Sequence, residues 1–152
     1  MKRIISSGLV LTLACLGLGS ASAQQTSAGT PLPYATGNPA TWPPELDAVV
    51  AAPGNHKVLM ENDSVRVLEV TVPPGTREPL HSHRWPSVLY FQAASDYVDR
   101  DAKGNVILDS RKLREPLKLP FAMWKEPEAP HSVENRSTTE ALRLIRVEIK
   151  KR

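Results

Sequence analysis

The sequence predicts an all-β domain, a sandwich or closed barrel of short strands, preceded by an N-terminal segment that is not part of the fold. Two observations support this fold class. From His56 onward, short runs rich in β-branched and aromatic residues alternate with turn residues, a pattern typical of sandwiches and barrels. After Ala52, no long stretch has the apolar period of a helix. With 152 residues, the chain is long enough for one domain and too short for two well-buried ones.

Residues 1–23 predict a secretory signal peptide. Lys2 and Arg3 give the chain a charged start, residues 4–18 are largely apolar, and residues 21–23 (Ala-Ser-Ala) form a small-residue cleavage pattern. The apolar run is short for a membrane span. We therefore expect an exported protein, periplasmic or secreted, with no transmembrane helix after signal removal.

Removal of the signal peptide changes the chemistry of the remaining chain. Without Lys2 and Arg3, 17 basic residues stand against 16 acidic ones, a net charge of +1, and this balance does not favour a nucleic-acid partner. Cys15, the only cysteine, also leaves, so the mature chain has no thiolate ligand and no thiol nucleophile. Two alternatives stay open. The segment could be an uncleaved membrane anchor, or Cys15 could carry a lipid, although the Leu expected three residues before it is displaced to Leu13.

Residues 24–55 predict an extended, Pro-rich leader that contains one short helix. Ser, Thr, Gly and Pro interrupt any regular pattern in its first part, where Trp42 could pin the leader to an apolar patch. The helix is expected from Pro44 to Ala52, because Pro suits a first helical turn and Pro53-Gly54 ends the helix.

The domain itself is expected at residues 56–149. Its clearest strand is residues 65–72, where β-branched residues alternate with polar ones, and Pro73-Pro74-Gly75 ends this strand with a turn. Further strands are expected at residues 88–91, 97–100, 106–109, 121–125, 131–135 and 142–149, with a hairpin turn at residues 101–105.

Three histidines are the candidate metal ligands. Side chains two residues apart project to the same face of a strand, so His81 and His83 offer two imidazoles together. His131, far along the chain, provides a third from another predicted strand. Neutral imidazole is a ligand for Zn, Cu, Fe or Ni. The remaining histidine, His56, is expected on the surface or as the cap of a turn.

The spacing of these residues resembles the motifs of the cupin superfamily. Gly75, His81 and His83 match its first motif, and His131 and Asn135 match two positions of its second. The resemblance covers nearly the whole folded part and implies a double-stranded β-helix (jelly-roll) barrel. It implies that His81, His83 and His131 bind a divalent transition metal (Fe, Mn, Zn, Cu or Ni) inside the open end of the barrel. It also implies a homodimer paired through strand edges.

The sequence departs from this pattern at the acidic ligand. The glutamate of the superfamily would fall at Ser87 or Val88, and neither is a carboxylate. Glu126 and Glu128 stand where a Pro and a Gly are expected. Three neutral imidazoles leave a divalent ion with its full charge, so such a site should attract anionic, bidentate ligands and leave coordination positions open. Glu78 or Glu128 could act as a substitute ligand.

Alternation also predicts part of the pocket wall. Counting in twos from His83 places Trp85, Ser87, Leu89 and Phe91 on the inward face. Tyr90 and Trp124 are further pocket candidates. For these aromatic residues, packing in the barrel core or in a lid is the alternative.

Three functions agree with these observations. The first is an exported metal-binding cupin acting as a dioxygenase on a small chelating substrate, with Glu78 as the best candidate for a general base. The second is a non-catalytic periplasmic protein that binds a metal or a small-molecule ligand. The third is a metal-free structural cupin, in which His81 and His131 are hydrogen-bonding pocket residues. The sequence contains no phosphate-binding loop, dinucleotide fingerprint or serine elbow.

Overall fold

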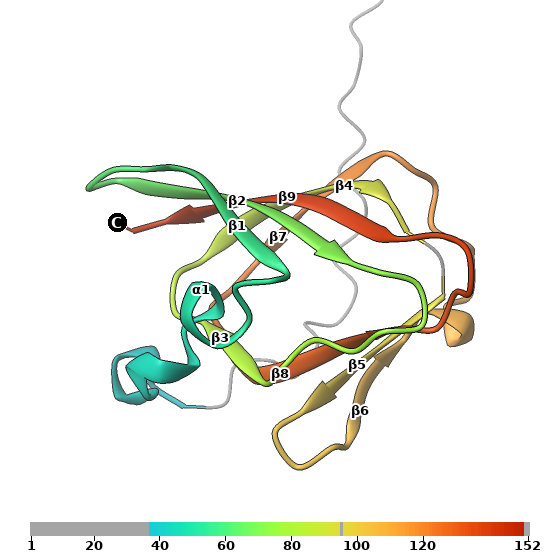
Figure 1. Cartoon of the computed structure of the whole chain (residues 1–152), viewed down its shortest axis with the longest axis horizontal. Helices are drawn as coiled ribbons and strands as arrows, with labels where there is room; N and C mark the ends of the chain where they lie inside the picture. The colour runs from blue at the N-terminus through green and yellow to red at the C-terminus, as the bar shows by residue number, and fades with distance from the viewer. Residues whose placement is uncertain (1–36, 95, 151–152) are drawn as a thin grey trace, which may run out of the picture. The chain divides into compact units, whose positions relative to one another are not determined.

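The structure, a computed structural model, describes residues 37–94 and 96–150. These residues form two facing antiparallel sheets, shown on opposite sides of the barrel in Figure 1. The larger sheet has the strand order β1-β2-β9-β4-β7, and the smaller has the order β3-β8-β5-β6. The strands are β1 His56–Glu61, β2 Val65–Val72, β3 His81–His83, β4 Ser87–Ala93, β5 Tyr97–Asp101, β6 Val106–Asp109, β7 Phe121–Lys125, β8 Glu128–Asn135 and β9 Leu142–Ile149.

The strand predictions agree with the structure where the alternation is clear. The bounds of β2, β6, β7 and β9 are those expected from the sequence, whereas β4, β5 and β8 extend up to three residues beyond their predicted ends. The turn after β2 contains Gly75 at φ +67°, a left-handed conformation that glycine adopts without a steric penalty.

Short helical segments precede β1 and follow β6. They are η1 Pro39–Thr41, η2 Pro44–Leu46, α1 Ala48–Ala51 and η3 Ser110–Lys112. The single helix expected between Pro44 and Ala52 is therefore interrupted at Asp47, which caps α1 by accepting a hydrogen bond from the Val49 amide. Trp42 is buried, as expected for a residue that anchors the leader. The predicted signal peptide lies outside the described residues, and within residues 37–94 and 96–150 no helix has the length and apolar character needed to cross a membrane.

Alternation along the larger sheet forms the apolar core. Every second residue of β2, β4 and β9 points between the sheets and is buried. The core consists of Leu68, Val70, Val72, Leu89, Phe91, Leu142 and Leu144. Each fully buried side chain of this size contributes about 1.5–3 kcal/mol through the hydrophobic effect. Asn135 joins the two sheets by donating from Nδ2 to the backbone oxygens of Val72 (2.9 Å) and Glu140 (2.8 Å).

The pairing of β3 with β8 contains an irregularity next to the histidines. His81 is opposite His131, but His83 is opposite Glu128, so two residues along β3 correspond to three along β8. A regular strand would place Glu128 and His131 on opposite faces because they are three residues apart. The extra residue turns both side chains to the interior, where both are buried.

Candidate metal centre

All four histidines of the chain are buried and lie next to one another between the sheets. His81 and His131 are direct neighbours across β3 and β8, with ring centroids 4.6 Å apart. His81 and His83 share a face of β3, and their centroids are 5.1 Å apart. His56 is 4.6 Å from His81 by the same measure. The expectation that His56 lies on the surface is therefore wrong: the turn after α1 directs the start of β1 into the interior, where His56 is only 4% exposed.

Each imidazole is held through its Nδ1 atom by an acceptor. These acceptors are the backbone oxygens of Ala52 for His56 (3.3 Å), Pro79 for His81 (2.9 Å) and Ala129 for His131 (2.9 Å), and Oε1 of Glu148 for His83 (2.8 Å). Because an oxygen of this kind only accepts, the neutral ring carries its proton on Nδ1 and keeps a lone pair on Nε2. Metal-binding histidines are oriented in this way.

The buried rings are held in the neutral form that metal ions require. Burial lowers the pKa of His56 to about 4. Burial also lowers the pKa values of His81 and His83 well below their ordinary value, and the neighbouring histidines and the positive charge of Arg146 lower them further. At neutral pH these three rings therefore present lone pairs rather than positive charges.

The candidate ligand atoms form two overlapping sets. One set consists of His56, His81 and His83, and the other of His83, Glu128 and His131; within each set the ligand atoms lie within 4.8 Å of one another. The three ligands implied by the resemblance are thus divided between the two sets, and His83 belongs to both. Imidazole nitrogens with or without one carboxylate are donors suited to divalent transition metals, so the residues present fit such an ion.

Two carboxyl groups border the histidines, and their pKa values are shifted in opposite directions. Although burial opposes ionisation, Arg146, His131 and Lys125 lower the pKa of Glu128 below its ordinary value, so Glu128 is ionised. Burial, with the nearby charge of Asp99, raises the pKa of Glu78 to about 8. Oε1 of Glu78 lies 3.9 Å from Nε2 of His56 and has no hydrogen-bond partner among the described residues.

A chain of buried ion pairs lies behind His83. Glu148, which accepts from His83, also accepts from Nε of Arg66. Arg66 in turn donates from Nη1 and Nη2 to the carboxylate of Asp47, at 2.9 and 3.2 Å. Burial alone would lower the pKa of Arg66, but its hydrogen bonds to Glu148 and Asp47 raise it. This chain connects the N-terminal cap of α1 to a candidate metal ligand.

The fold agrees with that of a solved cupin domain. A cupin domain from Bordetella pertussis Tohama I is 22% identical to this chain with a TM-score of 0.51, over 63% of this chain and 92% of that one. The chain has the cupin fold. This confirms the double-stranded β-helix barrel predicted from the sequence.

Other similar structures are more distant. They include an RmlC-like cupin family protein from Methanocaldococcus jannaschii (12% identity, TM-score 0.46, 62% of this chain and 77% of that one) and the polyketide cyclase RemF from Streptomyces resistomycificus (19%, 0.43, 64% and 65%). No protein-family model and no curated protein matches the sequence.

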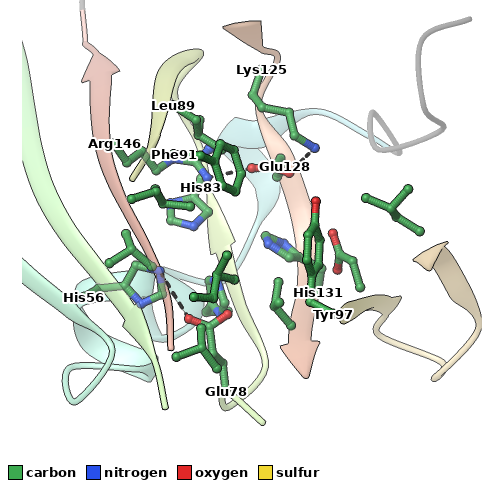
Figure 2. Close-up of a pocket in the computed structure, with 18 of the residues that line it drawn as sticks. His56, Glu78, His83, Leu89, Phe91, Tyr97, Lys125, Glu128, His131 and Arg146 are labelled. Atoms are coloured by element: carbon green, nitrogen blue, oxygen red, sulfur yellow. Dashed lines mark hydrogen bonds and ion pairs between the residues drawn. The ribbon is translucent and has the colours of Figure 1, made fainter. Parts of the chain in front are cut away.

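The histidines of this cupin barrel line a cavity of about 80 Å³, which Figure 2 shows in close-up. By the same measure a water molecule needs roughly 10–15 Å³, so the cavity has room for a small molecule. The other polar lining residues include Glu78, Glu128, Lys125 and Arg146, and the apolar wall includes core side chains such as Leu89 and Phe91.

Leu89 and Phe91 were predicted on the inward face and line the cavity, whereas the pocket candidates Ser87, Trp85, Tyr90 and Trp124 lie outside this lining. Ser87 is buried behind it, and its hydroxyl accepts a hydrogen bond from Nε of Arg146 (3.0 Å). Trp85 packs beneath the guanidinium of Arg66, whose Cζ atom lies 4.8 Å from the centroid of the Trp85 ring. Tyr90 and Trp124 are 42% and 46% exposed. The correction has a simple cause: Ser87, on the same strand as Tyr90, points inward, so alternation turns Tyr90 outward.

Three residues that line the cavity are His56, Glu128 and Arg146. The sequence did not predict His56 or Arg146 at the site, and it predicted Glu128 only as a substitute ligand. His56 depends on a long-range contact that alternation does not reveal. Glu128 was expected only as a substitute ligand, because its inward direction depends on the irregular pairing with β3. Arg146 shares its face of β9 with the buried Leu142 and Leu144. The sequence does not identify this face, because Ile145 and Val147 form an apolar alternation on the other one.

Proposed function

We propose that this chain is a metal-binding cupin that holds a divalent transition metal on its buried histidines and acts on a small chelating substrate. The observation that carries the proposal is the set of four imidazoles around one cavity, each fixed through Nδ1, of which His56, His81 and His83 are held neutral. A purely structural role does not require this arrangement, because hydrogen-bonded core histidines need not gather around one cavity.

The two ligand sets indicate which residues would hold the metal. His83 is common to both, with His56 and His81 or with Glu128 and His131 as its partners. A bound transition metal would act as a Lewis acid and orient a chelating substrate and dioxygen, the chemistry of a dioxygenase. The apolar side chains around the cavity would exclude bulk water from the substrate.

Glu78 is the residue that would transfer a proton. It lines the cavity, its Oε1 atom faces His56, and its pKa of about 8 keeps the proton at neutral pH in the metal-free protein. A positive charge bound nearby favours the carboxylate. Glu78 would then accept a proton from a substrate hydroxyl or enol.

Metal analysis of the protein purified from its own compartment tests the binding part of this proposal. We expect about one transition metal per chain, as one site of this kind would hold. His83→Ala should lose it, because both ligand sets contain His83. His56→Ala and His131→Ala each destroy only one set, so the variant that loses metal identifies the set in use. Glu134→Gln, on β8 and outside the cavity lining, is the matched control. A metal content below about 0.2 per chain, unchanged by His83→Ala, would contradict metal binding.

Oxygen consumption tests the catalytic part. We expect turnover with at least one member of a panel of diketones, thiols and polyphenols, and a loss of about 10²-fold or more in Glu78→Gln if Glu78 transfers the proton. A metal-loaded protein that binds panel members without consuming oxygen would instead be a non-catalytic binding cupin.

We also propose that the protein is exported, on the strength of residues 1–23. Mass spectrometry of the mature protein should find Gln24 at its N-terminus. A lipid on Cys15, or an intact segment 1–23, would contradict cleavage at this site.

A further inference from the structure

A cationic corner lies in the same cavity, next to the histidines. Arg146 extends from β9 and Lys125 from β7, and both line the cavity. Figure 2 shows them reaching Glu128 from two sides. The distances are 2.6 Å from Nη1 of Arg146 to Oε2 of Glu128 and 2.7 Å from Nζ of Lys125 to Oε1. One carboxylate is thus shared between two cations.

Arg146 has a donor left over. Its side chain is only 4% exposed. Nε donates to Ser87 and Nη1 to Glu128, whereas Nη2 is buried and has no hydrogen-bond partner among the described residues. Buried charged donors are nearly always paired in folded proteins, because an unmet donor loses its hydration without compensation. The free Nη2 therefore points to a ligand that accepts a hydrogen bond there.

The corner stands where the cupin resemblance places an acidic ligand. Ser87 occupies that position, and its small hydroxyl leaves room for the guanidinium of Arg146 to approach within 3.0 Å. Glu128 neutralises one of the two cations, so Arg146, Lys125 and Glu128 together keep one net positive charge. The carboxylate of an acidic ligand would balance this charge.

The size and walls of the cavity restrict the ligand further. The cavity measures about 80 Å³, and beyond the polar groups its wall is formed by apolar side chains such as Val70, Leu89 and Phe91. A single unpaired guanidinium nitrogen, with Lys125 beside it, suits one carboxylate, whereas a phosphate dianion would need more donors.

We propose that Arg146 is a specificity residue that receives the carboxylate of a small monocarboxylic acid with an apolar body. The substrate class assigned here deepens the proposed function and rests on it for the adjoining metal. The carboxylate subsite itself is formed by Arg146 and Lys125 and does not require the metal.

Calorimetric titration of the metal-free and the metal-loaded protein tests this subsite. The probes are isobutyrate, isovalerate and 2-oxoisovalerate, with isobutyramide and isovaleramide as uncharged counterparts of equal size and inorganic phosphate as the competing anion. We expect isobutyrate and isovalerate each to bind at least about tenfold more tightly than the corresponding amide, as is typical of a buried charge-assisted pair. Equal binding of acid and amide, or tighter binding of phosphate, would overturn the proposal.

Variants separate Arg146 from general charge effects. Arg146→Lys should weaken acid binding at least about tenfold, because a single ammonium group cannot hold Ser87 and Glu128 and also place a donor where Nη2 lies. Arg146→Met should abolish acid binding. Arg143→Met, three residues away on the outer face of β9, should leave acid binding unchanged. If the Arg146 variants do not fold, Lys125→Met provides the second test and should weaken acids but not amides; unchanged acid binding in a folded Arg146→Met or in Lys125→Met would refute the subsite.

The same measurements distinguish this proposal from the proposed function. Acid binding by a protein that never holds metal would refute the metal site and leave the carboxylate subsite intact. Normal metal content with no preference for acids over amides would refute the carboxylate subsite and leave the metal site intact.

Discussion

The two ends of the inner face of the larger sheet differ in chemistry, although the strands keep the same alternation throughout. The cross-strand row at one end is Val70–Leu144–Phe91, and the row at the other end is Arg66–Glu148–Ser87. Between them, Arg146 lies opposite Leu68 and Leu89. One sheet therefore changes from apolar core to buried ionic network within two rows.

The two rows contribute differently to the stability of the barrel and to the position of the histidines. The apolar row removes hydrocarbon from water and stabilises the barrel. In the polar row, the desolvation of Arg66 and Glu148 offsets much of their mutual attraction. What the polar row does provide is a fixed acceptor for Nδ1 of His83. The comparison predicts that substitutions at the polar end affect both folding and metal binding. A core substitution away from the cavity lining, at Leu68, should affect folding alone.

Glu148→Gln should have the largest effect. The amide keeps the size of the side chain but removes one of the two carboxylates that pair with Arg66. The loss should cost about 3 kcal/mol, the lower end of the range for a broken buried pair, because Asp47 still pairs with Arg66. Metal affinity should also fall about 10–100-fold, because His83 loses its charged partner. Urea unfolding and chelator competition measure the two effects. Glu69→Gln, which removes an exposed carboxylate from the neighbouring strand β2, is the control. Unchanged metal affinity in Glu148→Gln would show that Glu148 does not position His83.

Leu68→Ala should affect stability alone. Leu68 is fully buried in the apolar core and does not line the cavity, so its truncation should cost about 3 kcal/mol. The metal content of the folded variant should equal that of the wild type. A fall in metal per folded chain would mean that core packing opposite Arg146 also supports the metal site.

The metal-free protein should lose stability as the pH falls. The folded-state pKa of His56 is about 4, below its ordinary value of 6.5. Between these values the unfolded chain therefore binds more protons, and the free energy of unfolding decreases from about pH 6.5 to pH 4, by up to about 3 kcal/mol for this group. His81 and His83 act in the same direction. Urea unfolding at a series of pH values should show this slope, and a smaller one in His56→Gln; a flat profile would mean that these rings are not buried in the neutral form.

Tyr90→Thr should have the smallest effect. Tyr90 lies on the outer face of β4, and threonine retains the preference for an extended strand. We expect a change in unfolding free energy within about 0.5 kcal/mol and unchanged metal content. A loss of metal in this variant would restore Tyr90 as a residue that supports the pocket.

The sequence predicts the elements with simple local patterns. Alternating β-branched residues determine β2, and the spacing of His81 and His83 brings two imidazoles to one face. The match of Gly75 and these histidines to the cupin pattern then predicts the barrel, which the structure has.

The rest of the site depends on contacts that no local pattern contains. Glu128 faces inward only because β8 pairs irregularly with β3. The sequence does not show which face of β9 is buried, since Leu144 and Ile145 lie on opposite faces and both are apolar. Arg146 is therefore compatible with either the inner or the outer face. His56 contacts His81 because the turn after α1 directs the start of β1 into the interior. The two residues are distant in sequence, so no local pattern predicts this contact.

The position of Asp47 has one more consequence. This carboxylate caps α1 and also holds Arg66, whose other partner, Glu148, holds His83. Docking of the segment before β1 and ligand capture at His83 are therefore thermodynamically linked, and such coupling is reciprocal. We expect a ligand that stabilises His83 in its binding position to stabilise the docked segment as well, and release of that segment to weaken binding at His83. The same segment also contacts the site directly, because the backbone oxygen of Ala52 accepts from Nδ1 of His56.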